Sequence, residues 1–219
     1  MKQRMAVVTG GEQGLGFALS ELLLSEGFKV FSFDLKKSSS RDNKFFLKVD
    51  VSDEKQVIGA FKKISSVDVL INNAGIMRRS STFNSSVKDF DLLFDVNVKG
   101  AWLVTKHALH KLNKNARVLM ISSRHSSLPN NPGLYGLSKK TLELLGELLE
   151  KEPLVLKNNV VVKTAILGPF KTKLSMVGYT KDEYASRKNL LDKEVVAEKV
   201  FRLIFSKKKK LVYKNGLKK

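Results

Sequence analysis

Short apolar runs alternate along the chain with segments of helical periodicity, and this alternation restricts the fold more than any other feature. The runs predict buried strands at 5–9, 29–33, 45–51, 67–71, 117–121, 160–166 and 211–213. Helices are predicted at 17–24, 53–63, 90–112 with a break near Asn97, 135–149 and 195–205. Strands separated by helices of this length form βαβ units, so we expect an α/β protein with a doubly wound parallel β-sheet and helices on both faces.

Length and composition predict one domain. The chain has 219 residues, of which 42% are apolar, and we place the domain over 1–206 and a Lys-rich C-terminal tail over 207–219. The absence of cysteine excludes a disulfide scaffold, a thiolate nucleophile and Cys-ligated metals. No apolar run approaches the ~18 residues of a membrane span, and Met1–Arg4 is followed by too short an apolar core for a signal peptide. We therefore expect a cytoplasmic protein without a membrane partner.

Positive charge is concentrated toward the C-terminus. Lysine and arginine total 40 against 21 acids, a formal charge of +19, and residues 207–219 hold seven lysines and no acid. Such a tail can attract nucleic acid, anionic lipid or an acidic protein. No helix-turn-helix, zinc-finger or RNA-binding motif accompanies the charge, so we interpret it as a solvated tail and expect no nucleic-acid partner.

A glycine-rich turn follows the first predicted strand directly. It reads Thr9-Gly10-Gly11-Glu12-Gln13-Gly14-Leu15-Gly16 and leads into the first predicted helix. In a doubly wound sheet, such a turn brings backbone N–H groups to a pyrophosphate at the amino end of the helix. Glycine also suits an ordinary strand–helix turn, so the pattern alone fits both interpretations.

Two aspartates support the phosphate interpretation. Asp34 ends the second strand 18 positions after the last glycine of the turn, near the ~20 expected for a carboxylate that binds the adenosine ribose. Asp50 ends the third strand, where we expect it to meet the adenine edge. Because a carboxylate repels a 2′-phosphate, Asp34 favours NAD(H), while Lys36 and Lys37 keep NADP(H) as the second option.

Tyr135 and Lys139 lie one helical turn apart on the same face of a predicted helix. Tyrosine, with a pKa of about 10, is a poor acid or base at neutral pH, and a nearby ammonium lowers that pKa. The pair can then exchange a proton with a carbonyl or alcohol oxygen. Tyr184 and Lys188 have the same spacing, but only Tyr135 follows a strand ending in Ser122-Ser123, which can place a hydroxyl beside the substrate oxygen.

Together, these residues resemble the short-chain dehydrogenase/reductase family in its single-domain form, from Met5 to about Phe205. The matching stretches occur in the family's order: Thr9–Gly16, Asp34, Asp50-Val51, Asn72-Asn73-Ala74-Gly75, Asn97-Val98-Lys99-Gly100, Ile121-Ser122-Ser123, Tyr135–Lys139 and Gly168–Thr172. The resemblance implies a Rossmann-type fold, an NAD(P)(H)-dependent oxidoreductase acting on a small carbonyl or alcohol substrate, and a homodimer or homotetramer.

The resemblance also implies roles for individual residues. Tyr135 is the general acid/base, Lys139 lowers its pKa and holds the nicotinamide ribose, and Asn97 holds a water that links Lys139 to solvent. A hydroxyl of the Ser122-Ser123 pair orients the substrate oxygen. The implied cofactor-binding residues are Gly10, Gln13, Gly14, Leu15, Gly16, Asp34, Asp50, Val51, Asn73, Ala74, Gly75, Tyr135, Lys139, Gly168 and Thr172, the last reaching the carboxamide.

The sequence departs from the family pattern in several places. Ser122 has the usual distance from Tyr135, whereas Ser123 is one residue closer but matches the second serine of the strand-end motif; we favour Ser123 and keep Ser122 open. Leu167 replaces the usual proline before the glycine. The segment over about 172–192, which covers the substrate in the family, is short and polar, and the Lys-rich 207–219 replaces a glycine-rich end that usually forms a tetramer contact.

Several residues also fit other functions or sites. Arg78, Arg79 and Arg124 follow strand ends and are expected at the mouth of the site, where they bind an acidic substrate or carrier protein or are ordinary surface charge. A 3-oxoacyl-carrier-protein reductase is the narrower alternative, although those enzymes usually take NADPH. A nicotinamide-binding regulator without turnover is the alternative of another class.

His107 and His110 are interpreted as helix-surface residues, and His125 as a substrate contact or a solvated loop residue. No metal site is predicted.

Overall fold

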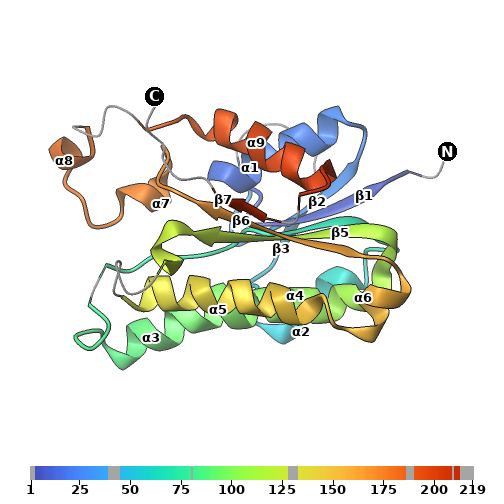
Figure 1. Cartoon of the computed structure of the whole chain (residues 1–219), viewed down its shortest axis with the longest axis horizontal. Helices are drawn as coiled ribbons and strands as arrows, with labels where there is room; N and C mark the ends of the chain where they lie inside the picture. The colour runs from blue at the N-terminus through green and yellow to red at the C-terminus, as the bar shows by residue number, and fades with distance from the viewer. Residues whose placement is uncertain are drawn as a thin grey trace.

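A computed structural model describes residues 3–38, 45–79, 81–127, 133–185, 190–208 and 210–212. Within these ranges, seven parallel strands form one sheet in the order β3-β2-β1-β4-β5-β6-β7 (Figure 1). The strands are β1 Met5–Thr9, β2 Lys29–Asp34, β3 Phe45–Lys48, β4 Val67–Asn72, β5 Leu112–Ser123, β6 Val161–Leu167 and β7 Lys210–Val212. The predicted doubly wound α/β fold is confirmed.

Helices cover both faces of the sheet (Figure 1). On one face lie α1 (Gly14–Ser25) and α9 (Lys193–Phe205), and on the other lie α2 (Glu54–Phe61), α4 (Gly100–Ala108) and α5 (Leu134–Leu149). The shorter helices are α3 (Val87–Phe94), α6 (Pro153–Lys157), α7 (Lys173–Met176) and α8 (Lys181–Ala185). None of the described helices is long and apolar enough to cross a membrane.

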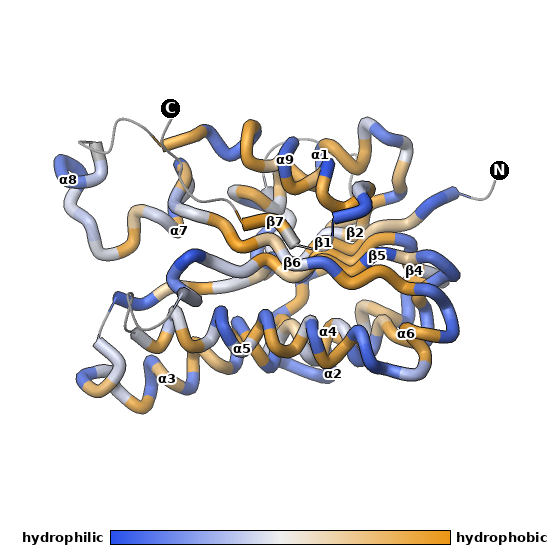
Figure 2. Tube along the Cα trace, in the orientation of Figure 1, coloured by the Kyte–Doolittle hydropathy of each residue, from blue (hydrophilic) through white to orange (hydrophobic). Residues whose placement is uncertain are grey.

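The central strands contribute alternate residues to two separate cores. Ala6 and Val8 of β1 pack in the cluster that includes α1 and α9, whereas Val7 between them packs in the cluster of the opposite face. Because both faces are covered, the central strands are continuously apolar, as Figure 2 shows. This is why the apolar runs identified the strands.

The strand order reverses between β1 and β4. From β1 the chain moves outward to β2 and β3, and from β4 it moves the other way to β5, β6 and β7. Loops that leave β1 and β4 therefore diverge at the carboxyl ends of these neighbouring strands. A doubly wound sheet binds its ligand in the crevice that this divergence opens.

The predicted helix over 90–112 is broken as expected near Asn97. The chain forms α3, then a π-helical turn over Asp95–Lys99, then α4 and a 3-10 turn over Leu109–Lys111. Asn97 lies within the π-helical turn. Here β5 also begins earlier than predicted, at Leu112, because its first residues extend the pairing with β4.

The helix predicted over 53–63 forms as the shorter α2, Glu54–Phe61. Asp53 is the N-cap of α2, and its carboxylate accepts hydrogen bonds from the backbone of Lys55 and Gln56. The Ser52 hydroxyl donates instead to the Asp50 carboxylate, 2.7 Å away. Aspartate caps a helix as well as serine does, and the side chain nearer the first free N–H groups takes the position.

The sheet extends past the predicted domain boundary at residue 206. Residues 210–212 form β7, which pairs in parallel with β6. The buried Lys163 of β6 donates from Nζ to the carbonyl oxygens of Ser206 and Lys208, each 2.6 Å away. The start of the predicted tail is thus part of the folded domain, and 213–219 lie outside the described residues.

Candidate active site

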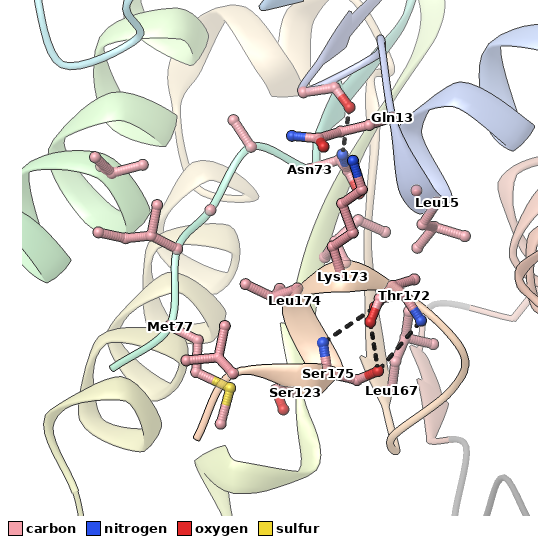
Figure 3. A pocket seen from close by; sticks show the side chains of 18 of the residues that line it. Gln13, Leu15, Asn73, Met77, Ser123, Leu167, Thr172, Lys173, Leu174 and Ser175 are labelled. Atoms are coloured by element: carbon pink, nitrogen blue, oxygen red, sulfur yellow. Dashed lines mark hydrogen bonds between the residues drawn. The ribbon is translucent and has the colours of Figure 1, made fainter. Parts of the chain in front are cut away.

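A cavity of about 1110 Å³ lies at the carboxyl ends of the strands. Its walls come from the turn after β1, the ends of β2 and β3, the loop after β4, the end of β5, the start of α5, and the segment from Leu167 to Tyr179. Figure 3 shows part of this wall, with side chains from the glycine-rich turn and from α7 facing the same space. The residues implied for cofactor and for chemistry share this one cavity, apart from Gly16 and Asn97, which lie behind its wall.

Hydrogen bonds tie the glycine-rich turn to the loop after β4. Asn73 Nδ2 donates to the carbonyl oxygens of Thr9 (2.9 Å) and Gly10 (3.1 Å), and the Thr9 hydroxyl accepts from the backbone N–H groups of Asn73 and Ala74. A Cβ on Gly16 would lie 2.1 Å from the Gly10 carbonyl oxygen. A side chain is thus excluded at Gly16, so the first turn of α1 packs closely against Gly10, as in a turn that binds a dinucleotide pyrophosphate.

Asp34 and Asp50 both line the cavity. The Asp34 carboxylate accepts hydrogen bonds from the backbone N–H groups of Glu12 (3.1 Å) and Leu35 (2.8 Å), so it is fixed at the end of β2. Asp50 lies in the turn after β3, which ends earlier than predicted, and one of its oxygens accepts from the Ser52 backbone and hydroxyl. These two carboxylates define an acidic end of the cavity.

The other implied cofactor residues line the same space. Gln13 precedes α1, and Thr172 precedes α7 and accepts the Ser175 N–H at its hydroxyl. The methyl group of Thr172 lies 3.8 Å from where a Cβ on Gly14 would be, so the start of α7 lies close to the glycine-rich turn. The remaining residues of this set on the wall are Leu15, Val51, Gly75 and Gly168.

Tyr135 is buried beside Ser123 at the floor of the cavity. Burial raises the pKa of Tyr135 to about 12, and the hydrogen bond with Ser123 acts in the opposite direction. Burial also lowers the pKa of Lys139 to about 8, and its Nζ donates to the Ile121 carbonyl oxygen at 3.0 Å. In the protein alone, desolvation of the phenol outweighs the effect of the Ser123 hydroxyl. Lowering of the Tyr135 pKa by Lys139 stays a prediction.

The two serines at the end of β5 face different partners. Ser122 is buried against α5, where its hydroxyl lies 2.8 Å from a carboxylate oxygen of Glu143 and 3.2 Å from the Lys139 carbonyl oxygen. Ser123 lies close enough to Tyr135 for its hydroxyl to lower the pKa of the phenol, and its Oγ lies 3.2 Å from Nδ1 of His125. The structure therefore brings Ser123, and not Ser122, to the tyrosine.

Asn97 joins three segments behind the cavity wall. Its amide nitrogen donates to the Ile76 carbonyl oxygen and to the Ser138 hydroxyl, both at 3.0 Å, and its oxygen accepts the Ile76 N–H at 2.8 Å. A Cβ on Gly75 would lie 3.0 Å from this oxygen and 3.1 Å from Lys139 Nζ. Asn97 thus holds the loop after β4 close to the helix that carries Lys139.

Sequence reasoning missed Glu143, Ser126 and Lys173. Glu143 is only 2% exposed, and its carboxylate accepts hydrogen bonds from the hydroxyls of Ser122 and Ser126. Its signal was its place one turn after Lys139. Lys173 extends from α7 toward Gln13 and the loop after β4 (Figure 3); nothing in the pattern of this polar segment indicated it. Across the described residues, no group of three His, Cys, Asp or Glu side chains could hold a metal ion.

Lys139 makes stability depend on pH. Its pKa is about 8 in the folded protein and 10.5 when unperturbed, so the unfolded chain binds more protons between these values. Its contribution to stability is complete above about pH 10.5 and is lost as the pH falls through about 8. We expect the free energy of unfolding of wild type, relative to Lys139→Met, to rise by about 2 kcal/mol from pH 7 to 9.5. Urea unfolding at both pH values measures this, and a constant difference would contradict the shifted pKa.

Comparisons with known proteins agree with this geometry. The sequence profile described as short chain dehydrogenase matches residues 4–183. An NADPH-dependent aldehyde reductase-like protein from Arabidopsis thaliana is 29% identical over 81% of this chain and 76% of its own length. Oxidoreductase UcpA from Escherichia coli is 30% identical over 68% of this chain, which spans 63% of UcpA.

A solved structure shows the same fold over nearly the whole length. The crystal structure of a short chain dehydrogenase family protein from Francisella tularensis superposes with a TM-score of 0.86, at 25% identity, and covers 98% of both chains. The glycine-rich turn, the serine at the end of β5 and the Tyr135–Lys139 helix lie within the matched residues. The chain is therefore a member of the short-chain dehydrogenase/reductase family of oxidoreductases.

Proposed function

We propose that the protein transfers a hydride between NAD(H) and a carbonyl compound or secondary alcohol, with Tyr135 as general acid/base. The observation that carries this proposal is the buried position of Tyr135 beside Ser123, whose hydroxyl acts on the pKa of the phenol, inside the cavity that also contains the glycine-rich turn and Asp34. A protein that only bound the nucleotide would not need a desolvated phenol and hydroxyl beside each other. Their presence argues against a regulator without turnover.

The residues of the chain would orient the substrate and supply the proton. The hydroxyls of Ser123 and Tyr135 would both donate to the carbonyl oxygen, which fixes its position and stabilises the charge that develops there. When bound, the cofactor supplies the hydride. With a pKa raised to about 12, Tyr135 keeps its proton at neutral pH and can release it to the more basic alkoxide oxygen. Lys139 would hold the nicotinamide ribose, and Asn97 would hold the relay water.

Replacing Tyr135 tests the proposed reaction. Tyr135→Phe keeps the ring and removes the proton donor, so we expect kcat to fall by about 10²–10⁴ while NADH binding changes less than about threefold. Tyr184→Phe is the matched control, because Tyr184 has the same spacing to a lysine and its hydroxyl contacts Ser175 in the substrate segment. Unchanged turnover in Tyr135→Phe would rule out the mechanism.

We propose that Glu143 positions Ser123. Its carboxylate binds Ser122 and Ser126, which flank Ser123 and His125 in the chain, and it lies on the same helix as Tyr135 and Lys139. It therefore sets the distance between the serine and the tyrosine. Such support matters because small displacements of a catalytic group cost large factors in rate.

Glu143→Leu removes this support. We expect kcat to fall about tenfold or more, with NADH affinity unchanged and partial recovery in Glu143→Gln, which keeps one acceptor oxygen. Glu147→Leu, an exposed position one turn later on α5, is the control. If kcat falls only in proportion to the folded fraction, measured by circular dichroism, Glu143 supports the fold alone.

The acidic end of the cavity supports NAD(H) over NADP(H). Asp34 and the nearly buried Glu12 both line it, and Glu12 is held by the Ser38 N–H at 2.8 Å. Lys36 and Lys37, which kept NADP(H) open, do not line the cavity. At the other side of the glycine-rich turn, Lys173 points toward the expected pyrophosphate position (Figure 3), and we propose that it neutralises this group.

A fluorescence titration with NADH and NADPH tests the cofactor assignment. We expect NADH to bind at least about tenfold more tightly, because two carboxylates oppose a 2′-phosphate. Lys173→Met should weaken ADP-ribose by a similar factor but leave adenosine unchanged, since only the former carries a pyrophosphate. Lys157→Met on α6 is the control. Preference for NADPH would overturn the assignment of Asp34 and Glu12.

We propose that the protein is a homodimer or a larger homo-oligomer. Leu137, Leu144 and Leu148 form an exposed apolar stripe on α5, and Trp102 on the adjacent α4 is 45% exposed. Both helices lie on the same face of the sheet (Figure 1). A second copy of this chain would cover them with the same face.

A further inference from the structure

Charged side chains are divided between the two ends of the cavity. The three acids that line it are Glu12, Asp34 and Asp50, all at the adenosine end. Near Tyr135 the charged side chains on the described wall are cationic and stand beside a histidine: Lys139 on α5, Arg78 and Arg79 after β4, and Arg124 with His125 after β5. Low-dielectric walls strengthen such a field, so this end attracts anions.

Arg79 is the best-placed of these cations. Its guanidinium lies over the Tyr179 ring, 3.7 Å from the centroid, and its aliphatic stem packs on Gly178, where a Cβ would lie 2.1 Å from Cδ. Gly178 has φ +77°, so the chain accepts this close approach only with glycine. Arg79 is thus held between the loop after β4 and the substrate segment by stacking and packing.

Among the described residues, none accepts a hydrogen bond from the N–H groups of Arg79, and none forms an ion pair with its guanidinium. Glu183 is near enough for Arg79 to contribute to its lowered pKa, after the larger effects of the Thr180 backbone and hydroxyl, but its carboxylate binds Thr180. Arg78 differs, since it donates to the Met77 carbonyl oxygen and lies 3.4 Å from Asp89.

A guanidinium fixed through its face offers its N–H edge to a planar or tetrahedral oxyanion. Ser123 and Tyr135 line the same cavity as Arg79, so one ligand in the cavity can contact all three. We propose that the carbonyl substrate carries a carboxylate or phosphate group and that Arg79 binds this anion. The proposal rests on the proposed function, and it names the substrate class: oxo acids or phosphorylated carbonyl compounds.

Matched substrates test the charge directly. With NADH, we would assay 2-oxo and 3-oxo acids against their methyl esters, and aldehyde or ketose phosphates against the free sugars. We expect kcat/KM to favour the anion by about tenfold or more at low salt, with the preference shrinking in 0.5 M NaCl. The comparison of acids with phosphates identifies which oxyanion the site takes.

Variants assign the effect to Arg79. Arg79→Gln should lose the preference for anions while keeping turnover of the neutral partners, and Arg79→Lys should retain part of it because the charge remains. Arg202→Gln, an exposed arginine on α9, should behave as wild type. A preference that persists in Arg79→Gln, or faster turnover of esters, free sugars or a 3-oxoacyl N-acetylcysteamine thioester, would overturn the proposal.

Binding separates this proposal from the proposed function. Calorimetry of the protein–NADH complex with butyrate and with inorganic phosphate needs no turnover. If no carbonyl compound reacts but at least one anion binds wild type about tenfold more tightly than Arg79→Gln, the anion site stands and the proposed reaction fails. If binding of neither anion is weakened in Arg79→Gln and no anionic substrate is preferred, the proposal of an anion site at Arg79 is wrong. This holds whether or not neutral ketones react.

Discussion

The hydrogen bonds between Asn73 and the Thr9–Gly10 backbone are the constraint on which the rest of the site depends. They join the carboxyl ends of β1 and β4 at the point where the two halves of the sheet diverge. This junction fixes the glycine-rich turn, and through the following loop it fixes Gly75 against Asn97 and Lys139. One amide side chain therefore sets the position of the nucleotide surface relative to the proton-transfer residues.

Burial gives the tyrosine and lysine their chemical properties. Desolvation raises the pKa of Tyr135 and lowers that of Lys139, so both tend toward their neutral forms in the protein alone. The cavity that contains both residues is acidic at the adenosine end and cationic near Tyr135. A ligand with charge opposite to that of the end where it binds would offset the charge of that end. Binding would therefore change the electrostatic field around Tyr135 and Lys139.

The sequence predicts the sheet and most of the site because both depend on local signals. Apolar runs such as 5–9 identify buried strands, and the glycines at Gly10–Gly16 identify the turn. The structure then shows the steric need for glycine there. The sequence does not predict the contacts of Glu143 and Arg79, because their partners lie in distant segments of the chain. The choice between Ser122 and Ser123 also required the structure, because only the direction of each side chain at the end of β5 distinguishes them.

The packing of α9 against α1 has a consequence for synthesis of the chain. Both helices cover the same face of β1, although α9 lies some 170 residues later. At about 5–20 residues per second, a ribosome needs roughly 10–35 s between the two. During this time the apolar face of Ala6 and Val8 is not covered by α9. We therefore expect the nascent chain to expose an apolar surface that chaperones can bind, and that can aggregate, until residues 193–205 emerge.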